Sequence, residues 1–249
     1  MVPGSSPGGP TNGKLVRAQA PDSYRDTKRS GYPERFFNTI NIMAQIKNII
    51  FDLGGVLLDL DFQRSIDAFE KLGISNFEHM FSQFKADELF AKLETGRMSE
   101  AAFYEAIKKR TEKTITEPEI DLAWNALILN FRTESLAELE KLAAGHTLYL
   151  LSNTNSIHLT YFKKLFTRQT GKPLLDQYFS KAWYSNEVGL RKPGKEIFEF
   201  VLQEENLAAA ETLFIDDTIT NIETARQLGF KTHLLLPAER IEFLEINSL

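Results

Sequence analysis

The sequence predicts an α/β protein with a doubly wound, Rossmann-like parallel sheet and an inserted helical cap subdomain. From about residue 133 onward, short apolar runs typical of buried strands alternate with amphipathic stretches typical of helices. Between the first such run, at residues 49–51, and the second, apolar residues recur at the helical spacing of three and four. Strands that alternate with helices form parallel sheets with both faces covered, so the first half of the chain supplies an insertion into that sheet.

Composition places the chain among ordinary globular proteins. Its 249 residues are 43% hydrophobic and 25% charged, and the length suits a core domain with a smaller inserted one. The formal net charge of -5 argues against nucleic acid as a general partner. The absence of cysteine excludes disulfides, thiolate metal sites and a cysteine nucleophile. No apolar run approaches the length of a membrane span, and we expect a cytoplasmic enzyme. We expect it to be a monomer or a homodimer.

Residues 1–44 form a separate N-terminal extension by composition. They are rich in turn-forming residues and show no apolar periodicity, which predicts disorder. Six basic residues stand against three acidic ones up to Ile42, and a targeting role is an open alternative. Our hypothesis is that Met43, directly before the first strand, is the natural start of the protein.

Residues 61–132 are predicted to be the helical cap. Ser99 is placed to cap one helix, and Glu117-Pro118 to open another that runs through Leu127 and Ile128. The phenylalanines of this region recur at helical spacing and are expected to form a core. No convincing strand is seen in it. The core domain is therefore residues 45–60 and 133–249.

The core elements follow in a regular order. Helices are predicted at 134–144, 157–166, 195–204 and 219–228, and Gly145 and Gly229 are placed to end the first and the last. After the first strand, further strands are predicted at 147–151, 182–184, 212–215 and 232–236.

Polar residues follow three of the predicted strands. Asp52 ends the first one, Ser152 and Asn153 follow the second, and Asp216-Asp217 follow the strand at 212–215. An acid at the end of a buried strand is costly unless that end opens onto a polar site. Because ligands bind at the carboxyl ends of strands in open α/β sheets, we expect these side chains to converge.

The residue types at this edge complement one another. Three carboxylates repel each other unless a cation neutralises them, and hard oxygen ligands suit Mg²⁺. A phosphoryl group would fit between the metal, the Lys192 ammonium of the loop at 189–194, and the donors of Ser152 and Asn153.

Four motifs in this order resemble those of the haloacid dehalogenase-like hydrolase superfamily. They are F-D-L-G-G-V-L, L-S-N-T-N, G-L-R-K-P and F-I-D-D-T-I-T-N-I, and the resemblance covers roughly residues 46–236. The insertion lies where the family has its helical cap. Within the superfamily the chain is most similar to bacterial sugar-phosphate phosphatases that resemble α-D-glucose-1-phosphate phosphatase.

The resemblance implies a metal site and a nucleophile. Asp52 would attack phosphorus and become an aspartyl-phosphate that water later cleaves. Asp217 would bind Mg²⁺ directly, together with Asp52 and the backbone carbonyl of Gly54. Asp216 would hold the waters of the metal.

The resemblance also implies the phosphate contacts. Ser152 and Asn153 would hydrogen-bond the phosphoryl oxygens, and Lys192 would neutralise them and orient Asp52. The implied function is Mg²⁺-dependent hydrolysis of the phosphate monoester of a small metabolite, a sugar phosphate in the first place. The alternative is a catalytically weak protein of the same fold that binds a phosphorylated ligand or a protein partner.

Gly54 departs from the family pattern. Most phosphatases of the superfamily carry a second aspartate here as general acid and base, a role worth about 10²–10⁴-fold in rate. Three explanations remain open: a substrate with a good leaving group such as a sugar 1-phosphate, a proton from a cap residue or a substrate hydroxyl, or lapsed activity. Gly54 argues against a mutase, and the acidic pair Asp216-Asp217 argues against a metal-free dehalogenase.

Other polar residues are weaker candidates. Arg97 lies in a turn between cap helices that some relatives place over the active site, although a solvated turn explains it as well. Asp59 and Asp61 fit the hinge into the cap. The four histidines show no metal-ligand spacing, and His158 is notable because it follows the S-N-T-N loop.

Overall fold

The computed structural model describes residues 45–82, 85–86 and 88–246. The predictions about residues 1–44, including the hypothesis about Met43, lie outside these described residues. In the part of the chain that is described, no helix combines the length and hydropathy needed to cross a membrane.

A five-stranded parallel sheet forms the centre of the core, as the sequence predicts. Its strand order is β7-β6-β1-β8-β9, so the first strand lies in the middle and Phe51 is in register with Leu150 on one side and Ile215 on the other. The strands are β1 (Asn48–Phe51), β6 (Thr147–Ser152), β7 (Lys181–Tyr184), β8 (Thr212–Asp216) and β9 (Lys231–Leu234). This is the predicted doubly wound α/β class.

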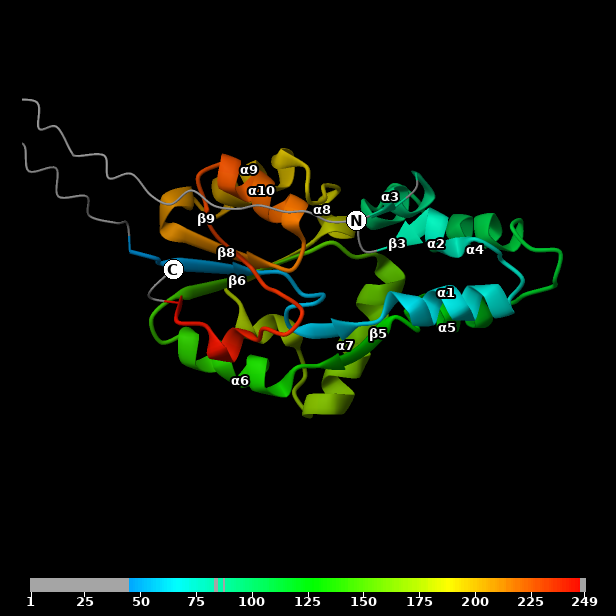
Figure 1. Cartoon of the computed structure of the whole chain (residues 1–249), viewed down its shortest axis with the longest axis horizontal. Coiled ribbons are helices and arrows are strands. Elements are labelled where there is room, and N and C mark those ends of the chain that lie inside the picture. The colour runs from blue at the N-terminus through cyan, green and yellow to red at the C-terminus, as the bar shows by residue number, and fades with distance from the viewer. Residues whose placement is uncertain (1–44, 83–84, 87, 247–249) are drawn as a thin grey trace, which may run out of the picture. The chain divides into compact units, whose positions relative to one another are not determined.

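Helices cover both faces of this sheet (Figure 1). They are α6 (Thr133–Leu142), α7 (Ser156–Thr170), α8 (Ser185–Val188), α9 (Lys195–Glu204) and α10 (Ile219–Gln227), with short 3-10 turns at Leu175–Tyr178, Ala209–Glu211 and Ile241–Phe243. Ile49 and Phe51 of β1 pack in the cluster that includes α6 and α7. Ile50 points to the other face, toward α9 and α10. Alternate residues of a strand face opposite sides, so a continuous apolar run suits this double burial.

Five helices of the insertion lie beyond the carboxyl ends of the sheet strands (Figure 1). They are α1 (Phe62–Lys71), α2 (Phe77–Met80), α3 (Glu88–Glu94), α4 (Glu100–Lys108) and α5 (Glu117–Asn125). Ser99 caps α4 as predicted, because its Oγ accepts the Ala102 N–H at 3.2 Å. Pro118 stands in the first turn of α5, also as predicted.

The prediction that this region holds no strand is wrong. Strand β5 (Ile128–Phe131) pairs antiparallel with β2 (Leu58–Leu60), and β3 (Phe81–Ser82) pairs with β4 (Lys85–Ala86). Leu127 and Ile128 continue the helical spacing of α5, which hides the strand in the sequence. Pairing with residues about seventy positions earlier decides the conformation, as tertiary contacts override local propensity.

Aromatic side chains form the core of the cap, as the sequence predicts for its phenylalanines. Phe69 and Phe77 stack with ring centroids 4.1 Å apart, and Trp124 packs against Phe90 at 5.1 Å. These side chains and Phe103 are fully buried. Offset and edge-to-face aromatic contacts add to area burial, so they hold the short cap helices together.

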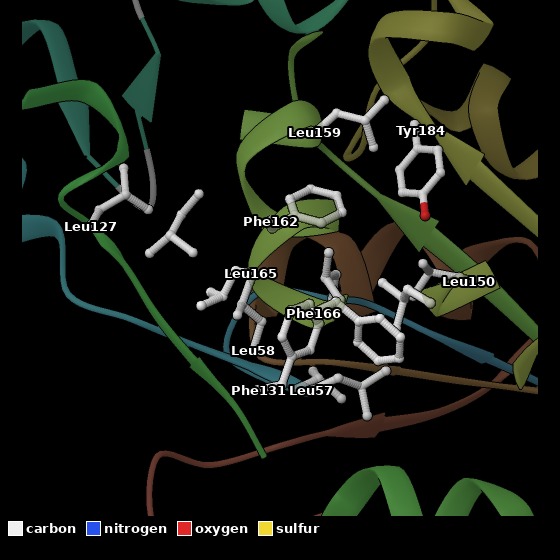
Figure 2. Close-up of a cluster of buried hydrophobic side chains, with 14 of the residues drawn as sticks. Leu57, Leu58, Leu127, Phe131, Leu150, Leu159, Phe162, Leu165, Phe166 and Tyr184 are labelled. Atoms are coloured by element: carbon white, nitrogen blue, oxygen red, sulfur yellow. The ribbon is translucent and has the colours of Figure 1, made fainter. Parts of the chain in front are cut away.

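Helix α7 packs between the sheet and the strand pair β2–β5, which leads into the cap and which we call the hinge. Figure 2 shows Phe162, Leu165 and Phe166 of α7 between Phe131 of the hinge strand β5 and Leu150 of β6. All of these side chains are buried. The helix starts directly after the S-N-T-N loop, so this packing fixes the position of that loop.

Candidate active site

The predicted strand-end residues do converge. Asp52 follows β1, Asp216 ends β8, and Asp217 comes next; their carboxylates offer oxygen atoms that all lie within 4.8 Å of one another. Parallel strands bring residues far apart in sequence to one edge of the sheet, which is the physical reason for the convergence. We call these three aspartates, with Lys192, the carboxylate cluster.

Lys192 joins two members of the cluster. Its Nζ lies 2.8 Å from Asp52 Oδ1 and 2.7 Å from Asp216 Oδ2, and it also donates to the Leu151 carbonyl at 2.8 Å. The side chain is 1% exposed. A buried ammonium is tolerated only when it is paired and hydrogen-bonded, and here all three of its donors have acceptors.

Asp216 is held by the protein itself. Besides Lys192, it accepts the Thr218 N–H at 2.7 Å and the Asn221 side-chain amide at 3.0 and 3.1 Å. Its side chain is fully buried. These contacts use both carboxylate oxygens, so Asp216 positions Lys192, whereas Asp52 and Asp217 line the pocket described below.

Asn153 makes two hydrogen bonds that its predicted role did not include. Its amide donates to the Lys192 carbonyl at 2.8 Å and its Oδ1 accepts the Lys192 N–H at 2.9 Å. The side chain therefore fixes the backbone of Lys192. Ser152, which precedes it, is buried and lines the pocket.

Two glycines shape the turn after Asp52. Gly55 has φ +70, and a Cβ there would lie 2.0 Å from Asp217 Oδ2, so only glycine lets the Asp217 carboxylate approach this closely. A Cβ at Gly54 would lie 2.6 Å from Cδ1 of Leu60. Because Cδ1 is the end of a flexible side chain, a small movement of Leu60 would make room for a side chain at residue 54.

The cluster carries excess negative charge. Burial, together with a smaller effect of the neighbouring carboxylates Asp216 and Asp217, raises the pKa of Asp52 to about 7, although the Lys192 ammonium opposes this. Burial and Asp216 raise the pKa of Asp217 to about 6. Burial also disfavours the Lys192 ammonium, but the charges of Asp216 and Asp52 outweigh this and raise its pKa.

A divalent cation fits this donor set. Three carboxylates against one ammonium leave two negative charges uncompensated. Repulsion between the carboxylates adds to burial in raising the pKa values of Asp52 and Asp217. Carboxylate oxygens are hard ligands that Mg²⁺ prefers. Asp52 and Asp217 are the members that line the pocket, so they are placed to bind the ion.

A pocket of about 370 Å³ opens above the cluster. Part of its lining is apolar. These residues come from the segment after β1, from the hinge and the start of α1, and from α7, and they are Leu53, Leu58, Leu60, Phe62, Leu127, Ile128 and Phe162. Three polar side chains, Glu94, His158 and Arg191, line it as well, and we call them the polar wall. A pocket of this size suits a small metabolite.

The structure shows which of the weaker candidates line the pocket. Arg97 is exposed and is not among the residues that line the pocket. Glu94, from the same turn region, lines it instead. Asp59 forms an ion pair with Arg132 at 2.7 Å, and Asp61 caps α1 through the Gln63 N–H at 3.1 Å, so both serve the hinge.

Sequence reasoning missed Glu94, Arg191 and Asn221 as residues of the site. Glu94 Oε2 lies 2.9 Å from Arg191 Nη2, and burial raises the pKa of Glu94 although the Arg191 guanidinium opposes this. Arg191 and Asn221 stand inside the quoted motifs, which was the available signal. Glu94 belongs to the same turn as Arg97, but it was expected to be solvated, because a charged residue at a helix end normally faces solvent.

The fold and the site define a class. Three converging carboxylates and a buried lysine lie at the carboxyl edge of a doubly wound sheet, under a helical cap. This arrangement suits a hydrolase that works on anionic groups. The model of the haloacid dehalogenase-like hydrolases matches residues 46–229, and the chain belongs to this family.

Relatives agree with this assignment. The chain is 33% identical to a D-ribitol-5-phosphate phosphatase of Bacteroides thetaiotaomicron over 75% of this chain and 90% of that one. A wild-type haloacid dehalogenase family enzyme from the same organism, crystallised with magnesium and inorganic phosphate, is 36% identical, with a TM-score of 0.72 over 79% of this chain and 97% of that one. A family hydrolase from Porphyromonas gingivalis has the same TM-score of 0.72 at 34% identity, over 79% of this chain and 94% of that one. Magnesium, the predicted cofactor, is thus the metal found in a relative.

Proposed function

We propose that the protein is a Mg²⁺-dependent phosphatase that hydrolyses the phosphate monoester of a small hydroxylated metabolite, a sugar or polyol phosphate. The observation that carries the proposal is the carboxylate cluster at the base of the pocket, in which Lys192 bridges Asp52 and Asp216. The names of the two Bacteroides relatives support it, one as a polyol phosphate phosphatase and one through its bound magnesium and phosphate.

Asp52 acts as the nucleophile in this proposal. One of its carboxylate oxygens attacks phosphorus, and the bond between phosphorus and the leaving oxygen breaks, which gives an aspartyl-phosphate and an alcohol. Water then attacks the same phosphorus, releases inorganic phosphate and restores the carboxylate. Lys192 holds Asp52 Oδ1 at 2.8 Å, which orients the attacking group.

The other residues bind and neutralise. Asp52, Asp217 and the Gly54 carbonyl would hold Mg²⁺, and Asp216 is the predicted holder of the waters of the metal. The bound ion would supply positive charge next to the phosphoryl oxygens. Lys192 supplies a second positive charge, and the Ser152 hydroxyl a hydrogen bond. Asn153 keeps the Lys192 backbone in place through its side chain, so its phosphate contact is assigned to its backbone N–H.

The proton for the leaving oxygen needs a source other than residue 54. Among the described residues that line the pocket, Glu94 is the carboxyl group that lies outside the cluster, and burial raises its pKa although the Arg191 guanidinium opposes this. This favours the explanation that a cap residue replaces the aspartate absent at Gly54. A sugar 1-phosphate, whose leaving oxygen is more acidic, remains the substrate predicted by the leaving-group explanation.

Phosphate release from a panel of sugar and polyol phosphates tests the proposal. The panel includes glucose 1-phosphate, glucose 6-phosphate, D-ribitol 5-phosphate and 4-nitrophenyl phosphate, each with Mg²⁺ and with chelator. Asp52→Asn keeps the size of the side chain and one acceptor oxygen but removes the nucleophilic carboxylate, and we expect turnover to fall below detection.

The outcomes separate the two functions. Turnover that requires both Mg²⁺ and Asp52 supports the phosphatase. Binding of Mg²⁺ and inorganic phosphate without turnover of any ester would instead support the non-catalytic alternative, a protein that binds a phosphorylated ligand.

A further inference from the structure

His158 is a buried histidine that the mechanism above does not use. It stands in the first turn of α7, where its N–H donates to the capping side chain of Asn155 at 3.0 Å. The residue is 8% exposed and lines the pocket together with Asp52. The helix that follows the loop of Ser152 and Asn153 therefore also brings this residue to the pocket wall.

The hydrogen-bond network fixes which ring nitrogen carries the proton. The Asn125 amide nitrogen donates to the Asp121 carbonyl at 2.9 Å, so its oxygen faces His158 Nδ1 at 2.9 Å. Two acceptors do not pair, so Nδ1 must carry the hydrogen. Nε2 of a neutral imidazole then has a lone pair and acts as an acceptor.

The surroundings keep this imidazole neutral. The Trp124 ring stacks on it with centroids 4.5 Å apart, and burial lowers the pKa of His158 to about 3. Nε2 is buried and has no hydrogen-bond partner among the described residues. An unsatisfied buried acceptor is costly, and a hydrogen-bond donor from a ligand would remove this cost.

We propose that Nε2 of His158 accepts a hydrogen bond from a hydroxyl group in the organic part of the substrate. The inference rests on the proposed phosphatase function and names its specificity: the pocket selects phosphate esters that carry a hydroxyl at this point over esters that lack one. His158 offers the pocket an acceptor and no proton, so it binds and orients the substrate and does not protonate the leaving oxygen. A site built to bind a hydroxyl discriminates against analogues without it, because the acceptor is then left unpaired.

Two variants at the same position separate the two ring nitrogens. The amide of His158→Asn reaches about as far as Nδ1 and keeps a donor for Asn125, but it removes the acceptor at Nε2. The amide of His158→Gln reaches about as far as Nε2 and restores an acceptor there. A purely structural role of the ring would make both variants equally poor.

Two substrates then report on the hydroxyl. D-Ribitol 5-phosphate carries several hydroxyl groups, and 4-nitrophenyl phosphate carries none. We expect His158→Asn to lower kcat/KM for D-ribitol 5-phosphate about 10-fold, the size of one neutral hydrogen bond, and to change it less than twofold for 4-nitrophenyl phosphate. His158→Gln should recover part of the loss.

The result that overturns the inference is an equal loss on both substrates, or no loss on either, in a variant whose unfolding temperature matches the wild type. The failure of the proposed function looks different, because the wild-type protein would then hydrolyse neither substrate with Mg²⁺ present.

A second measurement needs no variant. The wild-type enzyme is assayed with ribitol 5-phosphates that each lack one hydroxyl. Loss of the hydroxyl at one position should lower kcat/KM about 10-fold. Undiminished turnover of every deoxy analogue would overturn the inference even if the His158 variants do not fold.

Discussion

The carboxylate cluster and the polar wall belong to one site but differ in how their polar groups are satisfied. In the cluster, Lys192 has three acceptors and Asp216 accepts from Lys192, Thr218 and Asn221. In the polar wall, Nε2 of His158 and Nε of Arg191 are buried without a hydrogen-bond partner among the described residues.

The difference teaches which part of the site is complete before substrate binds. A network whose members satisfy one another is rigid and presents charge in a fixed place, which is what stabilisation of a transition state needs. Buried groups without partners are costly and gain when a ligand pairs with them. In the proposed phosphatase, the cluster that meets the phosphoryl group is therefore complete before substrate binds, and the polar wall is left to contact the organic group and the leaving oxygen.

Lys192→Met breaks the cluster and has the largest expected effect. Asp52 and Asp216 lose their buried counter-charge, which should lower the free energy of unfolding by about 3–5 kcal/mol and kcat by about 10³-fold. Denaturant unfolding and phosphate release measure the two. Adding Asp216→Asn removes one of the stranded charges, so the double variant should regain stability and not activity. A fully active Lys192→Met protein would contradict the cluster as described.

Glu94→Gln breaks the polar wall and should act on one class of substrate. If Glu94 gives the proton to the leaving oxygen, kcat falls about 10²-fold for alkyl phosphates and little for 4-nitrophenyl phosphate, whose leaving group needs no proton. The ratio of the two rates is the measurement. If the ratio of variant to wild-type kcat is the same for both substrates, Glu94 is not the proton donor. The absence of an acid at Gly54 would then be explained by a substrate with a good leaving group.

Gly55→Ala sharpens the comparison because it disturbs the cluster without removing any of its charged groups. The added Cβ would meet Asp217 Oδ2 at 2.0 Å, so we expect the Mg²⁺ concentration for half-maximal activity to rise about 10–100-fold. Gly171→Ala is the matched control, because Gly171 has a similar φ of +71 and nothing within 4 Å of an added Cβ. That control should lose stability and keep its Mg²⁺ requirement unchanged.

The smallest expected effect concerns pH and Mg²⁺. The pKa values of Asp52 and Asp217, about 7 and about 6, lie above the ordinary 3.8, so the folded metal-free protein holds these protons more tightly than the unfolded chain. Their contribution to stability is complete below about pH 4 and is lost as pH rises through 6 and 7. Each kcal/mol lost lowers the unfolding temperature by about 2–4 °C for a chain of this size.

Mg²⁺ should reverse this loss, because it binds the ionised carboxylates. Thermal unfolding at pH 5 and pH 8, with chelator and with Mg²⁺, gives the difference. The increase in unfolding temperature on addition of Mg²⁺ should be larger at pH 8 than at pH 5. In an Asp52→Asn, Asp217→Asn variant the Mg²⁺ effect should disappear, and if it persists the cluster is not the metal site.

The sequence by itself determined the fold class and the convergence of Asp52, Asp216 and Asp217. Asp52 and Asp216 stand at the ends of apolar runs, and the topology of parallel sheets brings such ends to one edge whatever the loops do. The order of the four motifs also predicted the family. Local pattern suffices here because it reports strand ends and burial directly.

Tertiary structure alone decided how these groups are paired and what surrounds the substrate. The Asn153 side chain holds the Lys192 backbone, Leu60 fills the space beside Gly54, and Glu94 turns inward. His158 becomes a neutral acceptor through Asn125, which lies 33 positions earlier. Each of these outcomes depends on contacts between segments distant in sequence, and neither periodicity nor spacing carries information about such contacts.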